Sequence, residues 1–104
     1  MFVSLIIVYI ILAEMSLIGG YSEFADRDEM ADKVLTDNYV AVRGVKGLEE
    51  AKLDELLLNY KYAKQVVAGL NFKFHITWKD GKYEVVIWRK LDNTYVFTSG
   101  KKIE

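Results

Sequence analysis

Cysteine and proline are both absent from this chain of 104 residues. Without cysteine, the chain can form no disulfide, has no thiol nucleophile and offers no thiolate to a metal ion. Histidine occurs once, as His75, which we expect to be solvated or bonded to a neighbour on the polar side of a strand. These absences predict a protein that is not an enzyme and that uses no metal and no cofactor.

An excess of charge of one sign is also missing, because the formal net charge is −1 and acidic and basic residues are interspersed along the chain. A nucleic-acid-binding surface needs clustered basic residues, so we expect no nucleic-acid partner. Apolar residues make up 52% of the chain, which is typical of a globular protein, and the length allows one domain.

The one long apolar run is residues 1–13, MFVSLIIVYIILA, which carries no charge and ends before Glu14. A run of this length matches the core of a signal peptide and is too short to span a bilayer. We predict a signal peptide at 1–13, a secreted domain at 14–104 and no membrane contact after cleavage. The alternative is that the segment stays in place as an uncleaved anchor.

A helix is predicted from Asp26, because Asp26 and Glu29 have the spacing of a capping box. Apolar residues then recur at helical spacing as far as Val45, with a gap at Asn38, which predicts about five turns that end at Gly44 and Gly47. Four carboxylates near its start fit a helix N-terminus, which favours negative charge: Asp26, Asp28, Glu29 and Asp32.

Alternating apolar and polar residues predict strands after this helix. Residues 48–58 are ambiguous between helix and strand, with the change placed near 53–56. An Asp-Gly turn at 80–81 and a turn at 91–94 separate the later strands. We predict strands at 58–63, 70–78, 83–91 and 94–99, followed by a polar tail at 100–104. The expected fold class is α+β, with one amphipathic helix packed on a four- to five-stranded antiparallel sheet.

The bend between the first two strands has an unusual composition, since it reads Gln65-Val66-Val67-Ala68-Gly69. Bends are usually built from glycine, asparagine, aspartate, proline or serine. Two exposed valines forgo about 1.5–3 kcal/mol each of burial energy. Either another surface covers this bend, or the segment is part of a buried strand; the pattern alone leaves both alternatives open.

The pentapeptide resembles the QVVAG signature of the cystatin and stefin family. Leu17-Ile18-Gly19-Gly20 is similar to that family's glycine-containing N-terminal trunk, and Gly20-Tyr21-Ser22-Glu23 resembles the start of a stefin. The resemblance covers nearly all of residues 17–100. It implies a cystatin-like fold and reversible inhibition of papain-like, cathepsin-type cysteine proteases.

The resemblance also implies which residues enter the protease cleft. Leu17 and Ile18 would be apolar anchors of the trunk, and Gly19 and Gly20 would let its backbone pass close to the catalytic centre. The first hairpin would contribute Gln65, Val66, Val67, Ala68 and Gly69, and the second hairpin Leu91, Asp92 and Asn93. We expect a monomer, and the apolar hairpin leaves a domain-swapped dimer open.

Some family features are missing. The disulfides of secreted cystatins are absent, and the second hairpin has neither the Pro-Trp pair of secreted cystatins nor the Leu-Pro of stefins. A second hypothesis is therefore a secreted binding module on the same scaffold that does not inhibit proteases. Trp78 and Trp88 are expected to pack on the sheet, and Tyr60 and Tyr62 to pack across strands.

Overall fold

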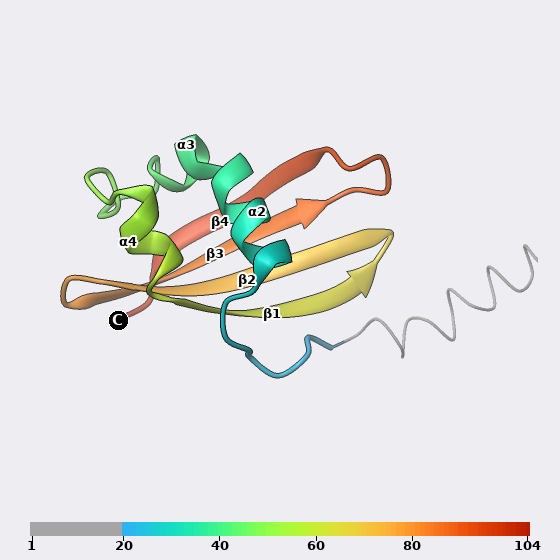
Figure 1. Ribbon diagram of the computed structural model, residues 1–104, viewed down its shortest axis with the longest axis horizontal. Coiled ribbons are helices and arrows are strands. Elements are labelled where there is room, and N and C mark those ends of the chain that lie inside the picture. The colour runs from blue at the N-terminus through green and yellow to red at the C-terminus, as the bar shows by residue number, and fades with distance from the viewer. Residues whose placement is uncertain (1–19) are drawn as a thin grey trace, which may run out of the picture.

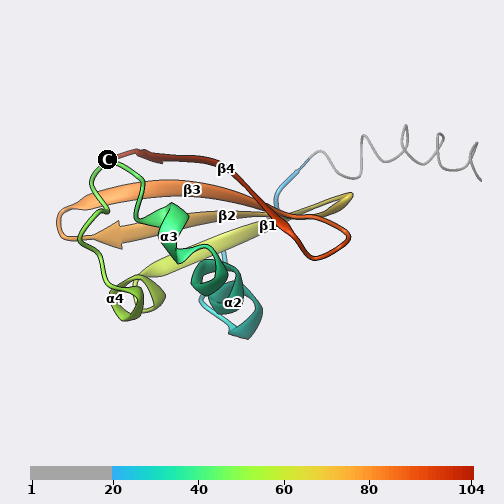
Figure 2. The same cartoon turned by 90° about the horizontal axis from the view of Figure 1, so that it is seen from above.

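The structure, a computed structural model, describes residues 20–104 and has α+β architecture. A four-stranded antiparallel sheet follows the order of the sequence, and three short helices lie on one of its faces (Figures 1 and 2). The strands are β1 (Tyr60–Val67), β2 (Gly69–Trp78), β3 (Gly81–Arg89) and β4 (Tyr95–Lys102). The helices are α2 (Glu29–Asp37), α3 (Tyr39–Val42) and α4 (Leu53–Leu57). The predicted α+β class and the four antiparallel strands are confirmed.

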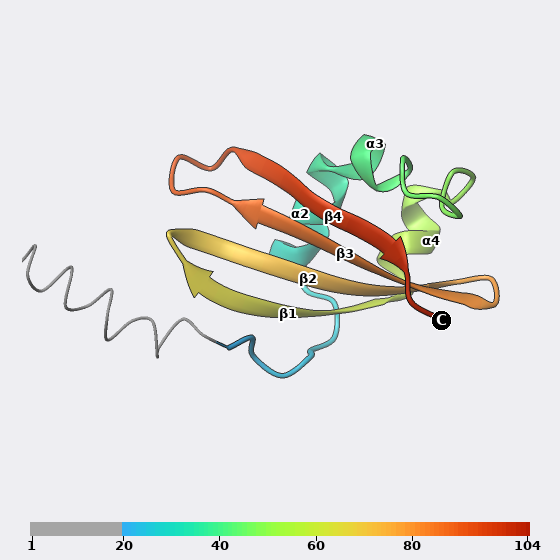
Figure 3. The ribbon, with the colours of Figure 1, turned by 180° about the vertical axis from the view of Figure 1, so that it is seen from behind.

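The core lies between this sheet and its helices, because alternate residues of each strand point to the helix side. On β2, Phe72, Phe74 and Ile76 are fully buried there. The rings of Tyr60 and Phe74 meet edge to face with centroids 5.4 Å apart, which confirms the predicted cross-strand packing. The opposite face of the sheet carries no helix of the described chain, and Figure 3 shows it from that side.

The single predicted helix is wrong in two respects. Its N-cap is Asp28, whose Oδ1 accepts a hydrogen bond of 2.8 Å from the Ala31 amide; Asp26 instead forms an ion pair with Lys61. The helix is also interrupted at Asn38, whose side-chain amide donates to the Val34 carbonyl at 2.8 Å. An asparagine side chain competes in this way with the helical backbone, so α2 and α3 are separate.

The ambiguous stretch ends in helix α4, and the change to strand comes at 58–59, after the predicted 53–56. Glu55 caps the N-terminus of α4, because its carboxylate accepts a hydrogen bond of 2.9 Å from the Lys52 amide. This bond lowers the pKa of Glu55. No helix within residues 20–104 is long and apolar enough to cross a bilayer.

The predicted polar tail is also wrong, because β4 continues to Lys102, where Lys101 and Lys102 pair with Glu84 and Tyr83. β4 is an edge strand, and exposed polar residues are typical of such an edge. In the β2–β3 turn the positive φ falls on Lys79 rather than on the Asp-Gly pair.

Candidate functional site

Two hairpin bends lie at the same end of the sheet, away from α4 and the C-terminus (Figures 1 and 3). The first joins β1 to β2 and the second joins β3 to β4. Neighbouring strands run antiparallel in the order β1 to β4, so every second bend falls at one end. The sheet therefore brings the pentapeptide Gln65–Gly69 to the same end as Leu91, Asp92 and Asn93.

The first hairpin is tighter than the sequence suggests. Gln65, Val66 and Val67 belong to β1, and Val67 pairs with Gly69 across the bend, so that Ala68 alone forms its tip. The side chain of Val66 is 63% exposed, whereas Val67 is half-buried. The predicted end of this strand at residue 63 is therefore wrong, because β1 continues to Val67. The segment is strand rather than bend as far as Val67, but it is not buried, since Val66 is exposed.

Two contacts hold this hairpin in shape. The Asn71 side-chain amide donates to Gln65 Oε1 at 3.0 Å across the β1–β2 pair. Gly69 has φ +100°, and a Cβ placed there would lie 2.2 Å from the Arg89 carbonyl oxygen. Glycine is needed at this position for both its conformation and the close approach of β3. The pentapeptide is therefore a fixed bend seated against the end of β3.

The second hairpin is ordered by its own side chains. Asp92 Oδ1 accepts hydrogen bonds from the Thr94 amide at 3.0 Å and the Thr94 hydroxyl at 2.6 Å, and these bonds lower the pKa of Asp92. Asn93 has φ +69°, a conformation that asparagine tolerates better than most residues. Leu91 is 78% exposed. Each hairpin thus presents one large exposed aliphatic side chain, Val66 or Leu91.

A hollow of about 250 Å³ separates the two hairpins. It is lined by Ala68, Trp88, Lys90, Leu91 and Asp92. The sequence does not identify Trp88 as a site residue. Its indole Nε1 nevertheless contacts the first hairpin, because it donates a hydrogen bond of 2.8 Å to the Ala68 carbonyl. Strand alternation predicts that Trp88 lies on a sheet face, and no sequence signal indicates a partner twenty residues away.

The N-terminal part of the described chain runs along the outer edge of β1. Ala25 exchanges two backbone hydrogen bonds with Tyr62. The Ser22 amide donates to the Lys64 carbonyl, and the Lys64 amide donates to the Ser22 hydroxyl. Because the pairing is antiparallel, the chain towards Gly20 runs in the direction of Val66 at the hairpin end. Within residues 20–104, no group beyond the chain neighbours lies within 4 Å of the position a Cβ would take at Gly20. Leu17, Ile18 and Gly19 lie outside the described residues.

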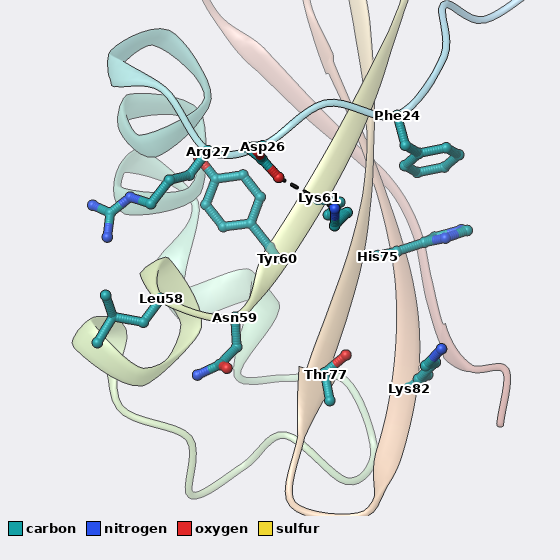
Figure 4. A pocket seen from close by; sticks show the side chains of 10 residues that line it. All are labelled: Phe24, Asp26, Arg27, Leu58, Asn59, Tyr60, Lys61, His75, Thr77 and Lys82. Atoms are coloured by element: carbon teal, nitrogen blue, oxygen red, sulfur yellow. Dashed lines mark ion pairs between the residues drawn. The ribbon is translucent and has the colours of Figure 1, made fainter.

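A second, larger hollow of about 730 Å³ lies around the start of β1, towards α4 (Figure 4). Its charged side chains are engaged in ion pairs, including Arg27 with Asp32 at 2.6 Å and Lys61 with Asp26 at 3.2 Å. His75 also lines it, with Nε2 3.1 Å from Glu84 and its ring stacked on Phe24 at 4.3 Å. The prediction of a locally bonded histidine is confirmed.

Within residues 20–104 no group of three or more histidine, aspartate or glutamate side chains could hold a metal ion. Among known proteins, no family model matches the chain, and neither a curated protein nor a solved structure matches it significantly.

Proposed function

We propose that this chain is a secreted, cystatin-like, reversible competitive inhibitor of papain-like cysteine proteases of the cathepsin type. The observation that carries the proposal is the pair of exposed aliphatic side chains, Val66 and Leu91, on two ordered hairpins at one end of the sheet. The N-terminal chain is directed towards the same end by its pairing with β1. Three segments of one edge could then enter one cleft together.

Apolar side chains at a bend favour a partner surface over solvent. Burying the exposed part of a valine or leucine side chain contributes on the order of 1–2 kcal/mol. Two such residues near the centre of an interface can supply much of its binding energy, because a few buried anchors dominate most interfaces. Val66 and Leu91 are the residues that we expect to act in this way.

Rigid hairpins bind with a smaller loss of conformational entropy than flexible loops. The first hairpin is held by the Asn71–Gln65 bond and by the close contact of Gly69 with Arg89, and the second by the bonds of Asp92 with Thr94. Inhibition by such an edge requires no nucleophile. It requires a shape that fills the substrate groove and holds no scissile bond in the attacked position.

The N-terminal trunk is the third segment that we propose to enter the protease cleft, beside the two hairpins. Leu17 and Ile18 would occupy apolar subsites on the non-primed side of the cleft, and Gly19 and Gly20 would allow close passage of the backbone. The hairpin of Gln65, Val66, Val67, Ala68 and Gly69 would lie over the primed side. Leu91, Asp92 and Asn93 would add a smaller contact. We expect the protein to act as a monomer that binds one protease.

The second hairpin favours an alternative function, a secreted binding module on the same scaffold without protease inhibition. Its exposed apolar surface is limited to Leu91, because Asp92 and Asn93 are polar and are used to order the turn. A hairpin end with so little apolar surface on the second hairpin could bind another partner in place of a protease.

An inhibition titration separates these two functions. The full chain is expressed in a secreting host, and the purified product is added to papain and to a cathepsin with a fluorogenic peptide substrate. Competitive loss of activity, with the chain uncleaved, supports inhibition. Full protease activity at micromolar concentrations of the folded protein rejects it and leaves the binding module.

Val66→Asp identifies the surface that acts, and Val40→Asp is its matched control. Val40 is 85% exposed on α3 and lies outside the hairpins, so both variants place a carboxylate at an exposed valine. Val66→Asp should raise the inhibition constant at least roughly tenfold, and Val40→Asp should leave it unchanged. Equal effects of the two variants would place the inhibitory surface elsewhere.

A further inference from the structure

Trp88 joins the first hairpin to the strand that leads into the second hairpin. Its indole Nε1 donates a hydrogen bond of 2.8 Å to the carbonyl of Ala68, the residue at the tip of the first bend. Trp88 lies near the end of β3, two residues before Lys90, whose amide donates to Thr94 in closing the second hairpin. One side chain therefore ties the first bend to the base of the second.

This bond reaches beyond the backbone pairing of the two central strands. The register of β2 with β3 ends at Leu70 and Arg89, so Ala68 has no partner in that ladder. The contact between Gly69 and the Arg89 carbonyl places the first bend against β3 but supplies no hydrogen bond to its tip. Among the hydrogen bonds of the described chain, the one from Trp88 fixes the Ala68 carbonyl.

The position of the indole also defines the hollow between the hairpins. The half-buried ring of Trp88 lines this hollow together with Ala68 and Leu91, and the Lys90 ammonium lies 5.8 Å from the ring centroid. A ring with a hydrogen bond at one end and a cation over its face has few alternative orientations. The indole thus bonds to Ala68 on one hairpin and lines the hollow that Leu91 of the other hairpin also lines.

We propose that Trp88 is a positioning residue for protease binding, which holds the tip of the first hairpin at a fixed distance from the second through its bond to Ala68. The inference rests on the proposed function, because the two hairpins must enter one cleft together. A tip that moves independently of Leu91 would bind with a greater loss of entropy and would dissociate faster.

The test compares Trp88→Phe with Trp78→Phe in the full chain from the secreting host. Both tryptophans donate their indole N–H, Trp88 to Ala68 and Trp78 to Glu55 at 3.4 Å beside α4, away from the hairpin bends. Phenylalanine keeps an aromatic ring and removes the donor in each case. Three measurements are made: the free energy of unfolding, amide hydrogen exchange of residues 66–70, and the inhibition constant with its dissociation rate.

The expected result is specific to Trp88→Phe. Exchange at residues 66–70 becomes faster, and the inhibition constant rises roughly threefold to tenfold through faster dissociation, as for the loss of one hydrogen bond. In both variants, protection of the central strand amides stays as in the wild type. Trp78→Phe leaves the exchange of residues 66–70 and the inhibition constant unchanged.

Two results would overturn the positioning role. Unchanged exchange at residues 66–70 in Trp88→Phe would show that the bond does not hold the hairpin, and this measurement needs no protease. Faster exchange with an unchanged inhibition constant would show that holding the tip does not matter for binding. If the wild-type protein inhibits no protease, the proposed function and the role of Trp88 in protease binding both fail. The exchange data then still decide whether Trp88 orders the hairpin.

Discussion

The hydroxyl of Tyr60 on β1 donates a hydrogen bond of 2.7 Å to Oδ1 of Asp32 on α2. Two similar bonds accompany it: Tyr62 donates to Asp28, which caps α2, and Tyr95 on β4 donates to Asp37 at 2.8 Å. Three phenols from the two edge strands thus hold one helix across the whole sheet. Asp28 and Asp32, two of the four carboxylates that the sequence assigns to a helix N-terminus, therefore also accept hydrogen bonds from the sheet.

Tyr60→Phe should lower the free energy of unfolding by about 1–2 kcal/mol. Tyr60 is only 6% exposed, and the variant removes a bond to a charged acceptor, although Asp32 keeps its ion pair with Arg27. Urea unfolding followed by circular dichroism measures the change.

Tyr83→Phe is the matched control for this variant. Tyr83 is 5% exposed, but its hydroxyl lies 3.5 Å from the Gly47 carbonyl, at the limit of a hydrogen bond. Its removal should change the unfolding free energy by less than about 0.5 kcal/mol. If Tyr60→Phe is as stable as Tyr83→Phe, the bond to Asp32 contributes nothing to stability.

The same phenols predict a loss of stability in alkali. Burial, and then the hydrogen bond to Asp28, raises the pKa of Tyr62 to about 12, and burial and Asp37 raise the pKa of Tyr95 to about 12. Both values lie above the ordinary tyrosine pKa of about 10, so the folded state holds these protons more tightly than the unfolded state. The stabilisation is complete below pH of about 10 and is lost as the pH rises through 12.

A phenolate absorbance titration with parallel circular dichroism tests this pH dependence. Late ionisation should coincide with unfolding, and Tyr62→Phe should remove one of the late-titrating groups. Ionisation of every tyrosine near pH 10 in a protein that remains folded would contradict the raised pKa values.

The structure shows where local sequence patterns were sufficient and where they were not. Strict alternation at Phe72, Phe74 and Ile76 predicts a strand with one buried face, because that pattern depends only on neighbouring residues. The break at Asn38 appears in the sequence only as a gap in the helical pattern. The N-cap is Asp28 rather than Asp26 because Ala31 and Tyr62 both donate to it, and Tyr62 is distant in the sequence.

In the candidate site, too, some features could be predicted from local sequence and others depend on how the strands pair. The apolar composition of the bend at Val66 is visible in the sequence, and the exposure of Val66 agrees with it. The bond from Trp88 to Ala68 depends on the register between strands, and the extension of β4 to Lys102 depends on backbone pairing. Neither feature leaves a periodic signal in the side chains, so neither could be predicted.

Gly69→Ala should both destabilise the protein and weaken inhibition. The new Cβ would lie 2.2 Å from the Arg89 carbonyl oxygen at φ +100°, so the backbone of the bend must shift. We expect a loss of about 2 kcal/mol or more in unfolding free energy. Gly20→Ala is the control for stability, because no described atom beyond its chain neighbours lies within 4 Å of its Cβ position, and its thermal unfolding should match that of the wild type. A Gly69→Ala variant as stable as the wild type would disprove the close approach of the bend to β3.

The trunk should affect binding without affecting stability. Gly19→Glu places a bulky charged side chain where the backbone is proposed to pass the catalytic centre, and deletion of residues 14–18 removes the apolar anchors Leu17 and Ile18. Each change should raise the inhibition constant roughly tenfold or more, because truncating an interface anchor typically costs about 2 kcal/mol. Both variants keep every buried core residue of the described chain, residues 20–104, so the unfolding free energy should stay within about 0.5 kcal/mol of the wild type. Protease titrations and urea unfolding of the same preparations measure both quantities. If both variants inhibit as strongly as the wild type, residues 17–19 make no contact with the protease and inhibition depends on the two hairpins alone.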